Sequence, residues 1–486
     1  MLRASRTTTR VATRLGARFA STFYPNEPNA PSVKTEVPGP ESKKAMERLH
    51  KVWDSSAANF VVDYYNSEGN YIRDADGNML LDVYAQIASN AIGYNHPKLK
   101  EVARSDESVN ALINRSATGN FPGTDFSEIL EKGVMAVAPK GMNHVWTALS
   151  GSDANETAFK AAFIYHQDKK RGMGKDFSAE ELESSMNNQK PGSPELSILS
   201  FESSFHGRTF GALSCTRSKP IHKLDIPAFN WPKAPFPHLK YPLEDHVKEN
   251  AEEEARCLAE FERILTTWSS PIAAIIVEPV QSEGGDNHAS PKFFQELRRI
   301  THKHDVLMIV DEVQTGVGAT GKFWAHEHWE LDTPPDMVTF SKKAQTAGYY
   351  FSNPELRPRL PYRQFNTWCG DASKLILARA IYDEVTKNGL VEKTAQVGDY
   401  LFKELEGLQK KYPDMIQNLR GKGMGTFIAW DAASPSARDA FLKKCKSNGL
   451  NIGGCGAQTV RLRPMLVFEQ SHANVLIDIL SKSLAN

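Results

Sequence analysis

Three side chains that could take part in proton and amine chemistry stand where predicted strands end. Glu278 follows the apolar run IAAIIV, Asp311 follows VLMIV, and Lys342 follows DMVTFS. In open α/β sheets, ligands bind beyond the carboxyl ends of the strands, so we expect these three side chains to converge on one pocket. Each has a plainer interpretation on its own, since an acid after a strand often caps a turn or helix and a lysine there is usually solvated.

The segment VTFSKKA contains two consecutive lysines, Lys342 and Lys343. In a strand, successive side chains point to opposite faces, so at most one of the pair can face a given site. We therefore expect one of the two lysines to take part in chemistry and the other to point away.

Two further stretches indicate what fills the pocket. TALSGSDANETAFKAA places Gly151 and Ser152 between a strand and a helix, where free backbone N–H groups suit a phosphate. In SSFHGRT, Phe205 offers a stacking face and Arg208 a fork for a carboxylate. A phosphate, a planar ring, an acid and a lysine together indicate pyridoxal 5'-phosphate (PLP). Lys342 would then bind the aldehyde as a Schiff base, and Asp311 would keep the pyridine nitrogen protonated.

A glycine-rich segment offers an alternative of another class. GVGATGKF at 316–323 satisfies G-x-G-x-x-G, and it matches the P-loop pattern until Phe323 replaces the hydroxyl that would hold magnesium. A nucleotide-binding protein is the alternative. Against it, DEVQT separates these glycines from the preceding strand, whereas a phosphate loop should leave its strand directly.

No metal site is predicted. His326 and His328 in FWAHEHW lack both the H-E-x-x-H spacing and a cysteine partner. The cysteines are scattered and form no C-x-x-C pair, which fits a reducing compartment.

Elements along the chain predict an α/β fold with a mostly parallel central sheet. Strand-like runs at 144–149, 196–201, 272–277, 306–310 and 336–341 alternate with helical stretches, and their continuous apolarity suits strands covered on both faces. Three short runs within 60–84 resemble a β-meander. A strand is expected at 459–464, and the polar segments 167–195 and 243–266 are interpreted as a surface excursion and a solvated helix. We expect a transit peptide at 1–22, an N-terminal segment at 23–85, a large cofactor-binding domain at 86–364 and a small domain at 365–486.

Charge and hydropathy exclude several classes of function. Lys+Arg and Asp+Glu both number 58, so nothing favours binding to nucleic acid, and no apolar run of about 18 residues indicates a membrane span. The first residues differ from the rest. Arg3, Arg6, Arg10, Arg14 and Arg18 fall on one helical face with no acid before Glu27, which is typical of a mitochondrial transit peptide.

The chain resembles the class III aminotransferases of PLP fold type I over nearly everything after the N-terminal peptide. VDEVQTG and TFSKK carry the class, and VEPVQSEGGDNHASPKFF, GKFWAHEHW, FNTW and VRLRPMLVF resemble the branch that acts on 4-aminobutyrate (GABA). The resemblance implies a large PLP-binding domain and a smaller α+β domain formed by the C-terminus and the N-terminal segment.

The resemblance also implies roles for single residues. Lys342 would bind the cofactor aldehyde, Asp311 would pair with the ring nitrogen, Val313 and Phe205 would sandwich the ring, and Gln314 would lie near the ring hydroxyl. Gly151 and Ser152 would hold the phosphate with Thr367 of the neighbouring subunit, and Asn155 and Glu278 complete the expected cofactor site. Arg208 would bind the remote carboxylate of the substrate while Glu283 masks Arg461, and Ile87 and Tyr84 would line the substrate end.

The implied function is ping-pong transamination of GABA to succinate semialdehyde, with 2-oxoglutarate converted to glutamate, by a homodimer with shared sites in the mitochondrial matrix. FHGRT also occurs in relatives that act on ornithine-type amines, so another ω-amino acid such as β-alanine stays open as substrate. Ser150 and Asp153 stand where animal relatives often carry cysteines, so we predict no iron–sulfur centre. Ala347 precedes Gly348 where relatives commonly have two glycines, which leaves the local loop geometry open.

Overall fold

The central element of the fold is a seven-stranded sheet with the order β3-β9-β8-β7-β6-β4-β5. The computed structural model describes residues 23–485, so the predicted transit peptide lies outside the described residues. The strands are β3 (His144–Ala148), β4 (Ser197–Phe201), β5 (Lys233–Ala234), β6 (Ile272–Val277), β7 (Leu307–Asp311), β8 (Met337–Phe340) and β9 (Ala347–Phe351). Strands β4 to β8 pair in parallel, and only β9 runs antiparallel to its neighbours. The sheet is therefore mostly parallel, as predicted.

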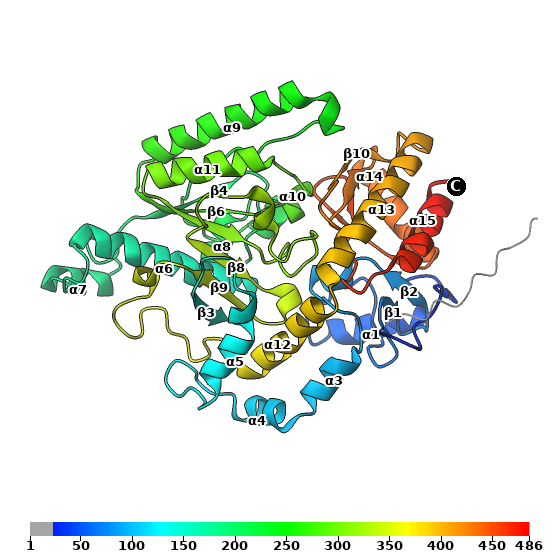
Figure 1. The fold of residues 1–486 in the computed structure, drawn as a ribbon, viewed down its shortest axis with the longest axis horizontal. Coiled ribbons are helices and arrows are strands. Elements are labelled where there is room, and N and C mark those ends of the chain that lie inside the picture. Colours follow the sequence, from blue (N-terminus) through cyan, green and yellow to red (C-terminus); the bar gives the residue numbers. More distant parts are fainter. Residues whose placement is uncertain (1–22, 486) are drawn as a thin grey trace, which may run out of the picture.

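Both faces of this sheet are covered by helices (Figure 1). Alternate strand residues such as Ile198, Ile276 and Ile309 pack with α6 (Gly151–Arg171). The residues between them, such as Leu199 and Val310, pack in the cluster that includes α9 (Val247–Thr267) and α11 (Pro291–Lys303). Because successive strand side chains point to opposite faces, a continuously apolar strand buries both of them.

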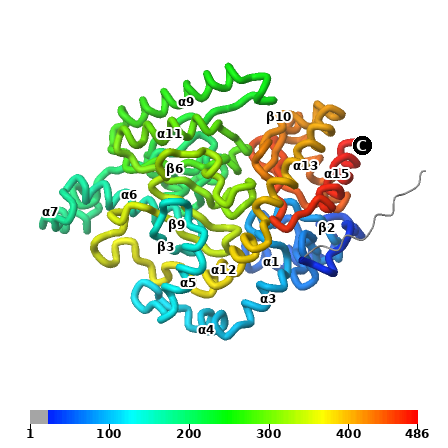
Figure 2. The backbone as a smooth tube through the Cα atoms, viewed as in Figure 1, coloured from blue at the N-terminus to red at the C-terminus, as the bar shows by residue number. Residues whose placement is uncertain are grey.

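A smaller α+β unit joins the two ends of the chain, which lie side by side in Figure 2. Its strands are β1 (Tyr71–Arg73), β2 (Met79–Asp82), β10 (Gln417–Arg420), β11 (Ala429–Asp431), β12 (Leu450–Asn451), β13 (Gly453–Cys455) and β14 (Thr459–Arg461). Strand β12 pairs in parallel with β2, and Leu81 shares a hydrophobic cluster with Trp430 and Leu476. The N-terminal segment therefore completes a core built mainly by the C-terminus.

The remaining helices of six or more residues connect or cover these two units. They are α1 (Pro40–His50), α3 (Pro97–Ala103), α4 (Asp106–Asn114), α5 (Phe126–Lys132), α7 (Ala179–Met186), α8 (Phe210–Cys215), α12 (Ala372–Lys387), α13 (Leu390–Lys411), α14 (Pro435–Ser447) and α15 (Gln470–Ala485). The polar segment 167–195 contains the end of α6 and all of α7, and 243–266 forms most of α9. Within the described residues, no helix has the length and apolarity needed to cross a membrane.

Two local expectations need correction. The first of the three expected strands does not form, and its residues contribute only an isolated bridge between Val62 and Asp74. The third strand of that sheet is instead β12, from the far end of the chain. The lysine pair is not in a strand either. β8 ends at Phe340, and the lysines form a 3-10 turn in which Lys342 has a left-handed φ of 49°. The turn, rather than strand alternation, separates the two amines.

Candidate active site

Asp311 ends β7 and is buried among polar groups from three other segments. One carboxylate oxygen accepts hydrogen bonds from Asn155 Nδ2 and lies 2.9 Å from His206 Nδ1, and the Asn155 bond is also 2.9 Å long. The other oxygen accepts from the backbone N–H of Val313 at 3.0 Å. A carboxylate offers about four lone-pair sites, so these contacts leave room for one further donor.

Glu278 follows β6 and holds the loop that carries Phe205. Its two oxygens accept from the backbone N–H groups of Phe205 at 2.8 Å and Ser282 at 3.2 Å. Burial, with the nearby charge of Asp311, raises the pKa of Glu278 well above its usual value. Glu278 thereby fixes both the predicted stacking residue and the start of α10 (Ser282–Gly285).

The N-terminus of α6 lies against the loops after β4 and β7. A Cβ on Gly151 would come within 2.7 Å of Val313 Cγ1, and a Cβ on Gly207, where φ is +123°, would come within 2.3 Å of Ser152 Oγ. Ser152 Oγ also accepts from the backbone N–H of Arg208 at 3.2 Å. Glycine at these two positions lets the free N–H groups of the helix face a pocket that Val313 borders.

Arg461 ends β14 and pairs with Glu283 in the interior. Arg461 Nη2 lies 2.6 Å from Glu283 Oε1, and the arginine side chain is only 1% exposed. Burial alone would raise the pKa of Glu283, because it disfavours the charged carboxylate. The charge and hydrogen bond of Arg461, together with nearby lysine charges, act against burial, and the net result is a lowered pKa. The buried Nε of Arg461 has no hydrogen-bond partner among the described residues. The arginine is thus held by one carboxylate and keeps one donor for another ligand.

Gln314 is oriented by two arginines. Its side-chain oxygen accepts from Arg461 Nη1 at 3.3 Å and from Arg463 Nε at 3.0 Å, and Arg463 in turn lies 2.5 Å from Asp286. Arginines only donate, so the Gln314 amide nitrogen must point away from them. It is then able to donate to a group in the pocket.

The two lysines have different surroundings. Burial lowers the pKa of Lys342 to about 8, with the charge of Glu283 opposing and that of Arg461 assisting. Lys343 Nζ donates to the backbone carbonyl of Gln314 at 2.5 Å, and burial lowers its pKa to about 7. Lys343 therefore links the turn after β8 to the loop after β7 by a hydrogen bond. The amine of Lys342 instead interacts with the charges of Glu283 and Arg461.

The remaining predicted residues are at least partly exposed. The guanidinium carbon of Arg208 is 5.7 Å from the centroid of the Phe205 ring, and Arg208 is exposed. Tyr84 lies 5.6 Å from the guanidinium of Arg461, measured to the ring centroid. Ile87 is 47% exposed in a turn where four successive residues adopt left-handed φ values, a conformation that costs about 1–2 kcal/mol per residue. Thr367 is exposed at the surface of the chain.

The glycines of the GVGATGK segment have a packing role. A Cβ on Gly318 would lie 3.3 Å from Leu466 and Val391, one on Gly321 would lie 3.0 Å from Ala395, and residues 315–320 are buried. These glycines let the segment approach α13 closely. A buried loop that packs on a helix does not bind a phosphate, so this glycine-rich segment does not support the nucleotide-binding alternative.

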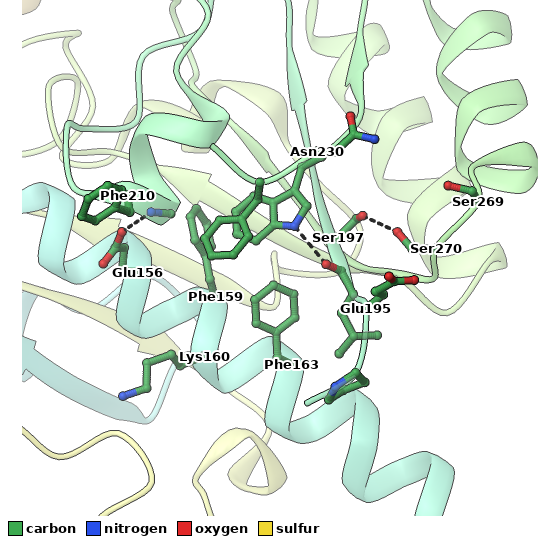
Figure 3. A pocket seen from close by; sticks show the side chains of 15 residues that line it. Glu156, Phe159, Lys160, Phe163, Glu195, Ser197, Phe210, Asn230, Ser269 and Ser270 are labelled. Atoms are coloured by element: carbon green, nitrogen blue, oxygen red, sulfur yellow. Dashed lines mark hydrogen bonds between the residues drawn. The ribbon is translucent and has the colours of Figure 1, made fainter. Parts of the chain in front are cut away.

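A separate cavity of about 780 Å³ lies away from these residues (Figure 3). It is lined by Phe159 and Lys160 of α6, by Trp231, and by Ser197 and Ser270 near the amino ends of β4 and β6. None of the predicted site residues lines it. Ligands in open α/β sheets bind at the opposite, carboxyl ends of the strands, so the cavity is not the candidate active site.

Sequence reasoning missed His206, Arg463 and Asp286. His206 stands between Phe205 and Arg208 in a stretch already singled out, and its contact with Asp311 depends on how two distant loops meet. Arg463 could have been found, because Arg461 and Arg463 are two residues apart and thus share a face of an extended strand. No sequence pattern marks Asp286, because its partner Arg463 lies just after β14, far along the chain.

Known proteins with similar sequences and folds decide the family. The model of the family described as aminotransferase class-III matches residues 52–484. The chain belongs to the class III aminotransferases. A 4-aminobutyrate aminotransferase from Emericella nidulans is 63% identical over 461 residues, which cover 95% of this aminotransferase and 92% of that relative. A mitochondrial 4-aminobutyrate aminotransferase from Sus scrofa is 48% identical, covering 94% of this chain and 91% of its own. The structure of lysine aminotransferase from M. tuberculosis in its internal aldimine form aligns with a TM-score of 0.80 at 28% identity, covering 91% and 99% of the two chains.

The cofactor of this aminotransferase is PLP, and the residues at the site fit it. Asp311 has an unused acceptor for a protonated ring nitrogen, and Gln314 has an amide donor that its arginine partners leave free. A Cβ at position 151 would collide with Val313, so glycine is needed there to keep the N-terminus of α6 against the loop after β7. Lys342 supplies a buried amine whose lowered pKa favours the neutral, nucleophilic form.

Proposed function

We propose that the enzyme transfers the amino group of GABA to 2-oxoglutarate. The observation that carries this proposal is the buried pair of Arg461 and Glu283, with nitrogen and oxygen 2.6 Å apart. An enzyme for GABA must accept a substrate with one carboxylate and then glutamate, which has two. A guanidinium that a protein carboxylate can cover suits both, and the names of the relatives from Emericella nidulans and Sus scrofa agree with it.

Residues from several loops and from the start of α6 would hold the cofactor. When bound, PLP supplies an aldehyde that condenses with amines and a ring that withdraws electrons from the reacting carbon. Asp311, fixed by Asn155 and His206, would keep a proton on the ring nitrogen. The backbone N–H groups at Gly151 and Ser152 would bind the phosphate.

Lys342 would move the proton in the reaction. Its amine, once free, would take the proton from the amino-bearing carbon of GABA, acting as general base, and would hold that proton at Nζ for the general-acid step. The pKa of about 8 suits this task, because a base whose pKa lies near the working pH both accepts and gives up a proton readily. Lys343 has a different task, since its amine is occupied by the Gln314 carbonyl.

Two guanidinium groups would sort the substrate carboxylates. Arg208, which is exposed, would bind the carboxylate remote from the reacting carbon in both half-reactions. Glu283 would leave Arg461 only when a second carboxylate arrives next to the reacting carbon, as it does with glutamate. The buried Nε of Arg461, which has no hydrogen-bond partner among the described residues, would donate to that carboxylate once Glu283 has moved.

We further propose a homodimer in the mitochondrial matrix. Thr367 is exposed in its own subunit, which suits a residue that completes the phosphate site of a partner. Phe210 and Phe229 line the separate cavity and are 65% and 54% exposed, so they offer apolar surface for such a partner. Relatives from Caenorhabditis elegans and Sus scrofa carry mitochondrial in their names, and the Arg-rich N-terminus of this chain agrees with them.

The test is the near-UV and visible absorption spectrum of the purified enzyme before and after GABA is added without an oxo-acid. We expect the band of the lysine-bound cofactor to convert to that of the amine form, and 2-oxoglutarate to reverse the change. Lys342→Ala should lose the starting band, and the matched change Lys343→Ala should largely keep it.

Each other outcome has a definite meaning. A band that ignores GABA but responds to β-alanine or ornithine would overturn GABA as the substrate and keep transamination. A band retained in Lys342→Ala and lost in Lys343→Ala would show that the wrong lysine is assigned.

A further inference from the structure

The turn that carries Ile87 is held in an unusual backbone conformation. Ala85, Gln86, Ile87 and Ala88 have φ values of 46°, 55°, 61° and 58°. None is glycine, and L-residues in a left-handed turn crowd Cβ against the following carbonyl oxygen. Such a run persists only where surrounding contacts impose it, and it commonly marks a functional site.

The contact that imposes it comes from Asp82 at the end of β2. This residue is completely buried, and one carboxylate oxygen accepts from the backbone N–H groups of Tyr84 at 2.9 Å and Ala85 at 3.0 Å. The same oxygen accepts from Asn451 Nδ2 of β12 at 2.8 Å. The start of the turn is therefore fixed to the sheet that joins the two ends of the chain.

A second contact fixes the middle of the turn. The other oxygen of Asp82 accepts from the Tyr94 hydroxyl at 2.7 Å, and that hydroxyl accepts from Gln86 Nε2 at 2.9 Å. Gln86 directly precedes Ile87, so the hydroxyl of Tyr94 connects the Asp82 carboxylate by hydrogen bonds to the residue next to Ile87. A buried network in which each member has its partner specifies a single conformation.

The turn also borders the site on two sides. Tyr84 precedes it and lies over the Arg461 guanidinium, and the carbonyl oxygen of Ala88 lies 3.5 Å from Lys343 Nζ. Between these ends the Ile87 side chain is 47% exposed, although isoleucine is usually buried. An apolar side chain held out on a strained turn beside a catalytic pocket is suited to limit the size of a ligand.

We propose that Asp82, acting through Tyr94 and the left-handed turn, is a positioning residue that sets the chain length of the amino acid the enzyme accepts. It holds Ile87 at the substrate end, and a looser turn admits a longer carbon chain. This inference rests on the proposed function and on the expectation, implied by the resemblance to the class III aminotransferases, that Ile87 lines the substrate end of the pocket.

The test compares kcat/KM for GABA with that for 5-aminopentanoate, which is one methylene longer, in the holoenzyme and its variants. We expect Asp82→Ala and the milder Tyr94→Phe to raise the ratio of 5-aminopentanoate to GABA, by about tenfold for Asp82→Ala. The absorption band of the bound cofactor should stay unchanged, because neither residue contacts the groups that would hold it.

A matched control separates positioning from general stability. Asp74 is also buried at a turn, accepting from the backbone N–H groups of Asp76 at 3.0 Å and Asn78 at 2.7 Å, between β1 and β2. Asp74→Ala should lower Tm and leave the ratio unchanged. In an Ile87→Ala background, Asp82→Ala should change the ratio much less than in the wild type, since both changes act on the same contact.

The outcomes distinguish this inference from the proposed function. A ratio shifted by Ile87→Ala and unchanged in Asp82→Ala and Tyr94→Phe would overturn the inference alone. An equal shift in Asp74→Ala would also overturn it, because loss of stability would then explain the effect. A wild-type enzyme inactive toward GABA would overturn the proposed function and this inference with it. Should Asp82→Ala fail to fold, Tyr94→Phe decides, since it keeps the carboxylate.

Discussion

Lys342 and Lys343 are neighbours in the turn after β8, and burial acts on both of their amines. Lys343 is 3% exposed, and burial lowers its pKa to about 7 from an ordinary value of 10.5. The unfolded chain therefore binds more protons than the folded one between pH 7 and about 10.5, so this residue makes the free energy of unfolding rise with pH across that window.

We predict that Lys343→Met removes this dependence in the enzyme freed of cofactor. Relative to the variant, the wild type should gain stability between pH 7.5 and 9.5, with an upper bound of about 5 kcal/mol over the whole window. Denaturant unfolding at several pH values measures it. Lys140→Met, a change at an exposed lysine, is the control, and parallel pH profiles for wild type and Lys343→Met would refute the prediction.

At Glu283 the prediction concerns substrate choice. Glu283→Ala leaves the Arg461 guanidinium uncovered, and an uncovered arginine beside the reacting carbon favours substrates with an α-carboxylate. We expect the ratio of kcat/KM for glutamate to that for GABA, measured in separate half-reactions, to rise about tenfold.

Glu283→Gln is the matched comparison, because it keeps an acceptor for Arg461 and removes the charge. It should give a smaller rise than the alanine variant. An unchanged ratio in both variants would mean that Glu283 does not mask Arg461.

At the scale of elements, α13 shows how one helix depends on close approach to the large domain. Gly398 and Gly407 both lie in this helix. A Cβ on Gly398 would come within 2.0 Å of the carbonyl oxygen of Gly425, and Gly425 itself packs against the backbone at Ala319. A Cβ on Gly407 would meet nothing within 4 Å.

We predict opposite effects of the same substitution at these two positions. Gly398→Ala should destabilise the fold by about 2–4 kcal/mol, because backbone on both sides must move. Gly407→Ala should stabilise it by about 0.5–1 kcal/mol, because alanine loses less backbone entropy in a helix. Thermal unfolding of both variants checks this, and equal effects would contradict the packing described here.

The elements that could be predicted from sequence are those with continuous apolar runs. IAAIIV forms β6 over the predicted residues, and the positions of Glu278, Asp311 and Lys342 at strand ends follow from such runs. The left-handed turn at 85–88 could not be predicted, because Asp82, Tyr94 and Asn451 impose it against local preference. The contact of His206 with Asp311 likewise depends on the order of strands in the sheet, which local pattern does not encode.

On the scale of the whole molecule, the site draws on both units of the chain. Asp311 and Lys342 follow strands of the large sheet, whereas Arg461 belongs to the smaller unit, and the Gln314 side chain touches Arg461 across the boundary. A movement of one unit relative to the other would change the Arg461–Glu283 pair and the orientation of Gln314, whereas Asp311 and Lys342 would keep their places at the large sheet. Substrate choice can therefore vary while the contacts of Asp311 stay unchanged.

Thr367 concerns whether a second subunit also contributes a residue to the site. It is exposed in its own subunit, and we predict that it serves the site of the partner. Thr367→Glu would place a negative charge next to the cofactor phosphate of the partner and should abolish activity in a homodimer. Lys342→Ala should also abolish activity, because it removes the amine that binds the cofactor aldehyde.

A hybrid dimer of the two variants would contain one site with a native Lys342 and a native Thr367. If subunits assort at random, half of the dimers are hybrids with one intact site of two, so co-expression in equal amounts should restore about a quarter of wild-type activity. If Thr367 instead served its own subunit, each hybrid site would still carry one of the two changes, and activity would stay at the level of the separate variants.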